Sequence, residues 1–359
     1  MHNNGDSVTM DISADNLLNV VKVRTDAITD DAFDDVAKTD IKETVIQNVL
    51  NPSVRNHVII DDSIINNRIT NNSDRSSPIG VFDSGIGGLS VYLHLTQQLP
   101  AERYVYYADT LNVPYGNRDS EDIETLTLAA VEWLYQQGCK LIVMACNSAS
   151  AYALEKARRS YPQILIVGLV PALKPAVLAS KSGRVAVLAT KATLNGSLLD
   201  EVINSVAKPN DTEVIKYFDP QLVPWVEAGM PEHDETAERL RQQLQVFATD
   251  GIDQLVLGCT HYPFFKAFLL DEIAKQQLSM QVVDSGQAIA ERVKQLLVAN
   301  QLSACLDNET EDSHLETHKK TNVDIKSPLT FYATRYDNKL NVLIQRLLGK
   351  TTIIQYYSK

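Results

Sequence analysis

From Ser77 onward the chain alternates short apolar runs with longer amphipathic stretches, and this alternation restricts its fold more than any other feature. The apolar runs have the length of buried strands and lie at 79–82, 104–107, 141–145, 165–167, 185–189, 254–257 and 281–283. The stretches between them, for example 123–137 and 233–247, carry apolar residues at helical spacing. Because parallel strands need crossover connections, usually helices, strands that alternate with helices indicate a parallel sheet. We therefore predict an α/β fold.

Two segments inside this folded part resemble each other. Residues 140–148 (KLIVMACNS) and 253–261 (DQLVLGCTH) each run from an apolar strand through a small residue to a cysteine followed by polar side chains. A strand that ends in acid or hydroxyl side chains precedes each of them, at 78–84 and 184–190. We predict two similar parallel-sheet α/β domains related by pseudo-twofold symmetry. Each presents one cysteine at the carboxyl end of a strand, the edge of an open sheet where ligands bind.

Two polar stretches stand outside this pattern. Residues 1–77 hold 13 acidic and 7 basic side chains, which is half of the chain's net charge of -12 in about a fifth of its length. This composition favours a disordered extension, with a docking or regulatory element as the alternative, and it lacks the regions of a signal peptide. Residues 303–326 have the composition of a solvated insertion before a last strand and helix at 329–332 and 339–348.

The composition excludes several functions. A net charge of -12 argues against a broad nucleic-acid surface, and no segment approaches the ~18 apolar residues of a membrane helix. Four cysteines without a C-x-x-C pair fit neither a disulfide scaffold nor a zinc ribbon. We expect a cytoplasmic protein with no metal and no nucleic-acid or membrane partner.

Cys146 and Cys259 are the first candidates for chemistry. Free cysteine is usually buried and packs as a small apolar residue, so either one alone would be interpreted as structural. Both, however, end a strand and are followed by hydrogen-bonding residues, a setting that can hold a thiolate. Cys139 and Cys305 lack this setting and are interpreted as incidental.

A glycine-rich turn, 83–88 (DSGIGG), links a strand to an apolar helical stretch. Such a turn can present backbone N–H groups to an anion. It matches neither G-x-G-x-x-G nor a P-loop, so a nucleotide cofactor is unsupported. Asp83 is then either a helix cap or an acid that binds a carboxylate or moves a proton.

Four further places carry polar side chains that are candidates for the site or for turns. Tyr115, in a stiff Pro-Tyr-Gly turn, offers its hydroxyl or its N–H to a carboxylate, although a purely structural turn is an equal alternative. His261 lies two residues after Cys259 and titrates near neutrality. Residues 284–286 (DSG) predict a turn that joins domains, and Glu227 is either a solvent-facing helix residue, which the pattern favours, or an acid at a site's rim.

Two thiols that face one site suggest racemisation. A racemase removes the α-proton from one face of a carbon and returns a proton to the other, so two acid/base groups are needed. A thiol with a pKa of about 8.5 can serve as either when its site tunes it. A cysteine hydrolase would instead need one nucleophile, one histidine and an oxyanion hole. The paired layout fits a racemase better.

At this point the motifs resemble those of bacterial glutamate racemase. In chain order they are 83–88 (DSGIGG), 109–116 (DTLNVPYG), 145–149 (ACNSA), 257–263 (LGCTHYP) and 283–286 (VDSG). The resemblance covers about residues 78–300 and resumes at 331–348. It implies a cofactor-independent isomerase that interconverts L- and D-glutamate for peptidoglycan synthesis, with the active site between two α/β domains. We place these domains at 78–173 with 286–359, and at 174–285.

The resemblance also implies roles for individual residues. Cys259 would deprotonate L-glutamate and Cys146 would deprotonate D-glutamate, with His261 assisting the first thiol and Asp83 the second. Glu227 matches an acid at the edge of the site. The residues that would hold the substrate's ammonium and carboxylate groups are Asp83, Ser84, Tyr115, Gly116, Asn147, Ser148, Thr260 and His261.

The chain departs from the family pattern in three places. Ser148 stands where the family most often has threonine, and the stretches 1–77 and 303–326 exceed the usual length. Residues 170–176 resemble the proteobacterial branch, some of whose enzymes need the activator UDP-N-acetylmuramoyl-L-alanine. A homodimer is compatible with the resemblance. The alternatives are an aspartate racemase of the same group, a cysteine-nucleophile amidohydrolase, and a non-catalytic binding protein.

Overall fold

The computed structural model describes residues 75–304 and 329–348, together with the backbone of 354–358. Most of the predicted N-terminal extension (1–77) and most of the polar insertion (303–326) lie outside the described residues, as does Cys305. None of the helices described in these ranges has the length and apolar character needed to cross a membrane.

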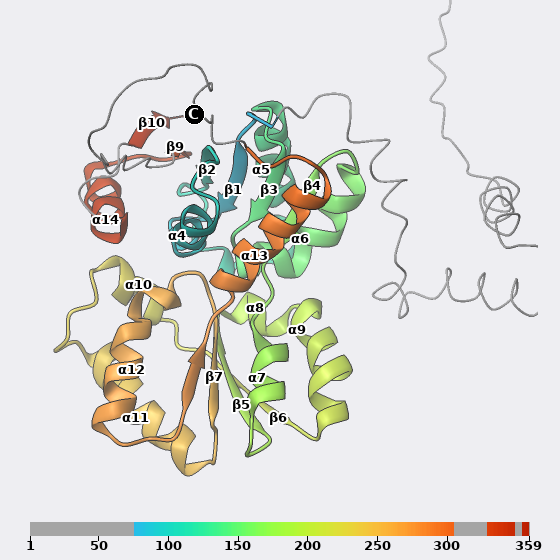
Figure 1. Cartoon of the computed structure of the whole chain (residues 1–359). Helices are drawn as coiled ribbons and strands as arrows, with labels where there is room; N and C mark the ends of the chain where they lie inside the picture. The colour runs from blue at the N-terminus through green and yellow to red at the C-terminus, as the bar shows by residue number, and fades with distance from the viewer. Residues whose placement is uncertain (1–74, 305–328, 349–353, 359) are drawn as a thin grey trace, which may run out of the picture. The chain divides into compact units, whose positions relative to one another are not determined.

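The strands form two sheets, and every strand pair within them is parallel (Figure 1). The six-stranded sheet has the order β10-β9-β2-β1-β3-β4, and the four-stranded sheet has the order β6-β5-β7-β8. The strands are β1 (Ile79–Asp83), β2 (Tyr104–Ala108), β3 (Leu141–Met144), β4 (Leu165–Gly168), β5 (Arg184–Ala189), β6 (Glu213–Tyr217), β7 (Gln254–Gly258), β8 (Gln281–Val283), β9 (Leu329–Ala333) and β10 (Ile354–Ser358). The predicted α/β class with two parallel sheets is confirmed.

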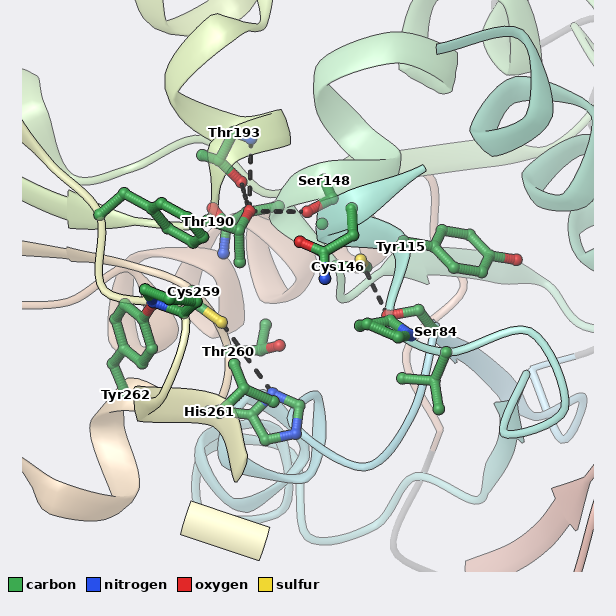
Figure 2. A pocket seen from close by; sticks show the side chains of 18 of the residues that line it. Ser84, Tyr115, Cys146, Ser148, Thr190, Thr193, Cys259, Thr260, His261 and Tyr262 are labelled. Atoms are coloured by element: carbon green, nitrogen blue, oxygen red, sulfur yellow. Dashed lines mark hydrogen bonds between the residues drawn. The ribbon is translucent and has the colours of Figure 1, made fainter. Parts of the chain in front are cut away.

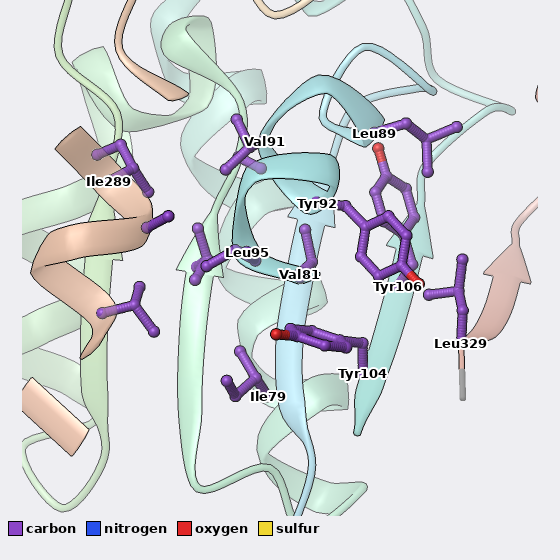
Figure 3. Close-up of a cluster of buried hydrophobic side chains, with 14 of the residues drawn as sticks. Ile79, Val81, Leu89, Val91, Tyr92, Leu95, Tyr104, Tyr106, Ile289 and Leu329 are labelled. Carbon is purple, nitrogen blue, oxygen red and sulfur yellow. The ribbon is translucent and has the colours of Figure 1, made fainter. Parts of the chain in front are cut away.

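Helices cover both faces of each sheet. They are α4 (Leu89–Gln98), α5 (Ser120–Gln136), α6 (Asn147–Ser160), α7 (Leu173–Ala179), α8 (Lys191–Asn195), α9 (Ser197–Val202), α10 (Leu222–Glu227), α11 (Glu235–Thr249), α12 (Lys266–Lys275), α13 (Gly286–Ala299) and α14 (Asn338–Leu348). Shorter turns are η2 (Tyr115–Asn117), η3 (Ile203–Ala207), η4 (Lys208–Asn210) and η5 (Tyr262–Phe265). On the six-stranded sheet, α4, α13 and α14 pack on one face and α5 and α6 on the other. Figure 3 shows the α4 side of this core, where Tyr92 meets Tyr104 edge to face.

The apolar runs became strands because they are covered on both faces. All residues of β1, β3 and β7 are buried, and a parallel strand between two helix layers therefore has no solvent-facing positions to alternate with. The apolar pattern does not predict β6, whose sequence EVIKY has no fully buried residue. Nor does it predict β10, which extends the six-stranded sheet beside β9.

The two sheets repeat one strand order. The order β2-β1-β3-β4 in the larger sheet corresponds to β6-β5-β7-β8 in the smaller one, with β9 and β10 added to the former. The register matches the two sheets residue by residue. Ile79 pairs with Leu141 in the first sheet, and its counterpart Val185 pairs with Gln254 in the second. Cys146 lies five residues after Leu141, and Cys259 lies five residues after Gln254. The predicted repeat is thus a repeat of topology.

The chain passes between the two sheets twice. It leaves the six-stranded sheet after β4 and returns after β8, and the two crossings are tied together by a hydrogen bond in which Ser285 Oγ donates to the carbonyl of Val170 at 2.8 Å. Asp284, beside it, pairs with Lys266 at 2.7 Å, which lowers the pKa of the carboxyl group although burial opposes this. Residues 284–286 therefore lie at a junction between the sheets, as their turn sequence predicts.

Candidate active site

A cavity of about 220 Å³ lies where the carboxyl ends of the central strands of both sheets meet (Figure 2). That volume is on the order of seven water molecules, a size suited to a small metabolite. Its wall includes the Pro-Tyr-Gly turn, the first residues after β3 and β7, and the loop before α10. The lining residues are Ser84, Val113, Pro114, Tyr115, Gly116, Asn117, Cys146, Asn147, Ser148, Thr190, Thr193, Phe218, Asp219, Pro220, Val223, Pro224, Glu227, Cys259, Thr260, His261 and Tyr262.

The two predicted cysteines both reach this cavity, and Figure 2 shows their sulfur atoms approaching it from two different sides. Both side chains are buried and both are free thiols. Cys146 follows β3 and Cys259 follows β7, so each comes from a different sheet.

Cys146 is the N-cap of α6, and its sulfur accepts a hydrogen bond from the N–H of Ala149 at 3.4 Å. Ser84 Oγ lies 3.5 Å from the same sulfur. Burial and, after it, the nearby Asp83 carboxylate raise the pKa of the Cys146 thiol to about 12, although the hydrogen bonds from Ser84 and Ala149 act to lower it. Cys146 is therefore a protonated thiol at neutral pH, poised to give a proton.

Cys259 has a histidine as its neighbour. The sulfur lies 4.0 Å from Nδ1 of His261, and Nε2 of that ring lies 3.2 Å from Oε1 of Glu227. Burial favours the neutral ring, but the contacts with Cys259 and Glu227 outweigh it and raise the pKa of His261 to about 10. Glu227, the last residue of α10, is exposed on one side and reaches the cavity on the other, so it is an acid at the rim. The pattern had favoured a solvent-facing residue.

Asp83 lies behind the cavity wall, and its predicted place as a substrate-binding residue stays a prediction. It is buried, it does not line the cavity, and its Oδ2 accepts a hydrogen bond from Thr260 Oγ1 at 3.2 Å. Burial raises the pKa of its carboxyl group. The helix-cap alternative is wrong, because α4 begins at Leu89 and has no side-chain cap, while Asp83 Oδ1 accepts from the N–H of Gly85.

The glycines of the 83–88 turn serve close packing. A Cβ at Gly87 would lie 2.5 Å from both Nδ1 of His261 and Oγ1 of Thr260, so only glycine lets this turn approach the residues around Cys259. Gly116 does the same in the Pro-Tyr-Gly turn, where a Cβ would lie 2.9 Å from Cβ of Thr190. Both glycines sit where one half of the molecule touches the other.

Hydroxyl groups connect the two halves beside the cavity. Ser148 Oγ, at the start of α6, lies 2.9 Å from Thr190 Oγ1, which lies 2.9 Å from Thr193 Oγ1 (Figure 2). Thr190 and Thr193 line the cavity although no sequence motif predicts them as site residues. The internal repeat could have found the first, because the strand register makes Thr190 the counterpart of Ser84.

The remaining predicted residues line the cavity, but not all of their polar atoms are available to a ligand. Ser84, Gly116, Asn147, Ser148 and Thr260 line the cavity. Tyr115 lines it too, but its hydroxyl donates to Oδ2 of Asp109 at 2.7 Å and so points away from the site. Only its turn backbone remains available. Within the described residues, Oδ1 of Asn147 and the hydroxyl of Tyr262 are buried without a hydrogen-bond partner, which leaves Asn147 an acceptor for a ligand's donor.

The cavity is poor in fixed positive charge. The described residues that line it include no lysine or arginine, so His261 is their one cation. A ligand's carboxylates would bind to hydroxyl groups and to N–H groups at the start of α6, where the helix dipole favours negative charge. In the described ranges, no group of three or more His, Cys, Asp or Glu side chains is placed to hold a metal ion.

Comparison with known proteins gives one consistent family. The Asp/Glu/hydantoin racemase family model matches residues 79–293. Glutamate racemase from Deinococcus radiodurans is 47% identical over 240 residues, which cover 67% of this chain and 81% of that protein. Glutamate racemase from Ectopseudomonas mendocina is 42% identical over 228 residues, 64% of this chain and 85% of that protein.

Solved structures show the same likeness. Glutamate racemase from Francisella tularensis in complex with D-glutamate matches with a TM-score of 0.64 and 26% identity, covering 79% of this chain and 98% of that one. Glutamate racemase from Escherichia coli in complex with L-glutamate and the activator UDP-MurNAc-ala matches with a TM-score of 0.61 and 27% identity, covering the same shares.

Proposed function

The chain belongs to the glutamate racemases of the Asp/Glu/hydantoin racemase family, and we propose that it interconverts L- and D-glutamate with Cys146 and Cys259 as its two acid/base groups. One observation carries the mechanism. Two free thiols from different sheets reach a single cavity, each in a different electrostatic setting. The reaction supplies D-glutamate for peptidoglycan synthesis, the usual role of this family.

In each direction of the reaction, one thiol removes the α-proton and the other thiol gives its own proton to the opposite face of the α-carbon. With L-glutamate bound, Sγ of Cys259 takes the α-proton, and the electron pair left on the α-carbon spreads into the adjacent carboxylate. The S–H of Cys146 then gives its proton to the opposite face and leaves a thiolate there, while Cys259 is left as a thiol. D-glutamate reacts by the reverse path.

Each thiol has a partner suited to its step. The His261 imidazolium stabilises the negative charge of the Cys259 sulfur from 4.0 Å, and Glu227 keeps that ring protonated. Burial and Asp83 keep Cys146 protonated and ready to act as an acid. We therefore assign Asp83 to positioning and to electrostatic control of Cys146, without direct contact with substrate.

The hardest demand is the weak acidity of the α-proton. Charge that grows on the substrate's α-carboxylate needs donors that are already in place. We propose that the N-terminal turn of α6, with Asn147 and Ser148, and the residues Thr260 and His261 supply them. Thr260 would do so through its backbone N–H, because its hydroxyl donates to Asp83. The free acceptor Oδ1 of Asn147 suits the substrate's ammonium group. A buried site strengthens these contacts because little water competes.

The decisive experiment uses purified, pyridoxal-free protein and L-glutamate in D₂O. Optical rotation and the α-proton NMR signal are followed together, and both should decay to zero. Exchange without loss of rotation would contradict the two-base mechanism. Activity on aspartate and none on glutamate would favour an aspartate racemase, and a trapped acyl-enzyme would favour an amidohydrolase.

Three further points extend the proposal. The E. coli relative carries an activator in its structure, so the assay is repeated with UDP-N-acetylmuramoyl-L-alanine, and a rise in rate would show activation here too. We propose a cytoplasmic enzyme, which cell fractionation tests, and a homodimer, which light scattering tests. We also propose domain boundaries at 78–173 with 286–359, and at 174–285, in line with the membership of the two sheets.

A further inference from the structure

Asp109 is a buried carboxylate whose partners come from the loop that leads into one cavity wall and from the residue that follows β9. It follows β2, and its side chain accepts hydrogen bonds from three donors on both of its oxygens. The donors are the Asn112 side-chain amide at 3.0 and 3.1 Å, the Tyr115 hydroxyl at 2.7 Å and Thr334 Oγ1 at 2.9 Å. Among the described residues no lysine, arginine or histidine forms an ion pair with it, so neutral donors alone satisfy this charge.

These bonds fix one wall of the cavity. Val113, Pro114, Tyr115, Gly116 and Asn117 line the cavity in a row. Asp109 anchors this row through two hydrogen-bond partners. Asn112 lies just before the row, and the Tyr115 hydroxyl belongs to its middle residue. The wall then rests on the other half of the molecule at Thr190, where Gly116 leaves no room for a side chain.

Asp109 also ties this wall to distant parts of the chain. Its own N–H donates to the carbonyl of Asp83 at 3.0 Å, next to Ser84 in the site. Thr334, just after β9, donates to Asp109 and accepts from the N–H of Leu111 at 2.9 Å. The segment after the polar insertion therefore helps to hold the substrate-binding wall.

We propose that Asp109, supported by Thr334, is a positioning residue that sets the affinity for glutamate by holding residues 113–117 in place. This inference rests on the proposed function for its substrate. A wall that binds the substrate's side-chain carboxylate, whose charge does not change during the reaction, acts equally on ground state and transition state. Loosening it should raise KM and leave kcat nearly unchanged.

The test compares Asp109→Asn and Thr334→Val with the wild-type enzyme. Asp109→Asn keeps the shape but replaces one acceptor oxygen by a donor, and KM should rise about tenfold, the loss of one charge-assisted hydrogen bond. Thr334→Val should raise KM about threefold, and Thr334→Ser, which keeps the hydroxyl, should restore it. In both weakened variants kcat should change less than about threefold.

Asp253→Asn is the matched control. The Asp253 carboxylate also holds a loop, because it accepts hydrogen bonds from Ser180 Oγ and from the N–H groups of Lys181 and Ser182. It lies just before β7, at the amino ends of the strands, whereas the cavity lies at their carboxyl ends. This variant should leave KM and kcat unchanged even where its melting temperature falls.

Hydrogen exchange gives a second readout that does not depend on activity. Amides of residues 111–117 should exchange faster in Asp109→Asn and Thr334→Val, and not in Asp253→Asn. Unchanged exchange at residues 111–117 in Asp109→Asn and Thr334→Val, together with an unchanged KM, would overturn the inference. A loss confined to kcat would overturn it as well. If the wild-type enzyme fails to racemise glutamate, the proposed function fails and exchange at 111–117 still decides the role of Asp109. If Asp109→Asn does not fold, Thr334→Val decides it.

Discussion

The surroundings of Cys146 and Cys259 are built on the same strand order, yet they hold different partners. By strand register, Asp83 beside Cys146 corresponds to Ala189, and His261 beside Cys259 corresponds to Ser148. Each half thus has an ionisable partner that the other half lacks. The repeat places two thiols symmetrically, and the substitutions around them make one an acid and put the other beside a cation.

This difference is compatible with a symmetric reaction. The enantiomers have equal free energy, so kcat/KM must be the same in both directions at every pH and in every variant. The two environments can therefore differ in which proton transfer limits the rate, and only measurements that see individual steps will separate them.

The largest effect is expected from removing either thiol. Cys146→Ala and Cys259→Ala should each lower racemisation more than about 10³-fold, because one face of the carbon then has no acid/base group. The assay is loss of optical rotation, with Cys139→Ala, which removes a buried thiol away from the cavity, as the control. Full activity in either variant would refute the two-base mechanism.

Exchange of the α-proton sharpens the same comparison. In Cys146→Ala the remaining thiol should exchange the α-proton of L-glutamate with solvent while the configuration is retained. In Cys259→Ala the same should hold for D-glutamate. NMR in D₂O measures this, and exchange from the opposite enantiomer would reverse the assignment of faces.

The partners of the thiols should matter less, by about 10²-fold each. His261→Gln and Asp83→Asn keep the size of the side chain but lose its charge, so each impairs one proton transfer. The α-deuterium isotope effect on kcat should then rise for L-glutamate in His261→Gln and for D-glutamate in Asp83→Asn. Equal isotope effects in both directions would mean that the two partners serve both thiols.

The pH dependence should show a tenfold fall per unit at its alkaline end. His261, whose pKa is raised to about 10, is protonated below that pH and loses its charge above it. If the imidazolium supports Cys259, kcat/KM should fall above about pH 10, equally for both enantiomers. Cys146 adds no change below about pH 12. His261→Gln should lack the fall. Rate measurements between about pH 7 and about pH 11, a range that brackets the raised pKa of His261, would reveal the difference.

The smallest effect is expected where the halves touch through hydroxyl groups. Thr190→Val removes the partner of Ser148 together with the contacts to Thr193, and it should lower kcat/KM about threefold to tenfold, on the order of one or two neutral hydrogen bonds. Thr190→Ser should retain most of the activity. If Thr190→Val behaves like wild type in steady-state kinetics, the contact does not help to form the site.

The sequence predicts the strands and the two thiols because their signals are local. An apolar run that ends in cysteine is visible in a few residues, and it became β3 with Cys146 and β7 with Cys259. The direction of the Tyr115 hydroxyl and the site role of Thr193 depend on contacts between segments far apart in the chain. The edge strand β6 was missed for another reason, since a partly exposed strand needs no apolar run.

The hydrogen bond between Ser285 and Val170 has a consequence for how the molecule can be rearranged. The four-stranded sheet enters and leaves the rest of the chain at neighbouring points, like a cassette inserted into a host. If the cassette were excised, a short linker could close the gap between Val170 and Ser285, and the six-stranded sheet would keep its strand order. Cys146 and Cys259, which we propose as the catalytic pair, are therefore divided between the host and the inserted part, and we expect neither part to racemise glutamate alone.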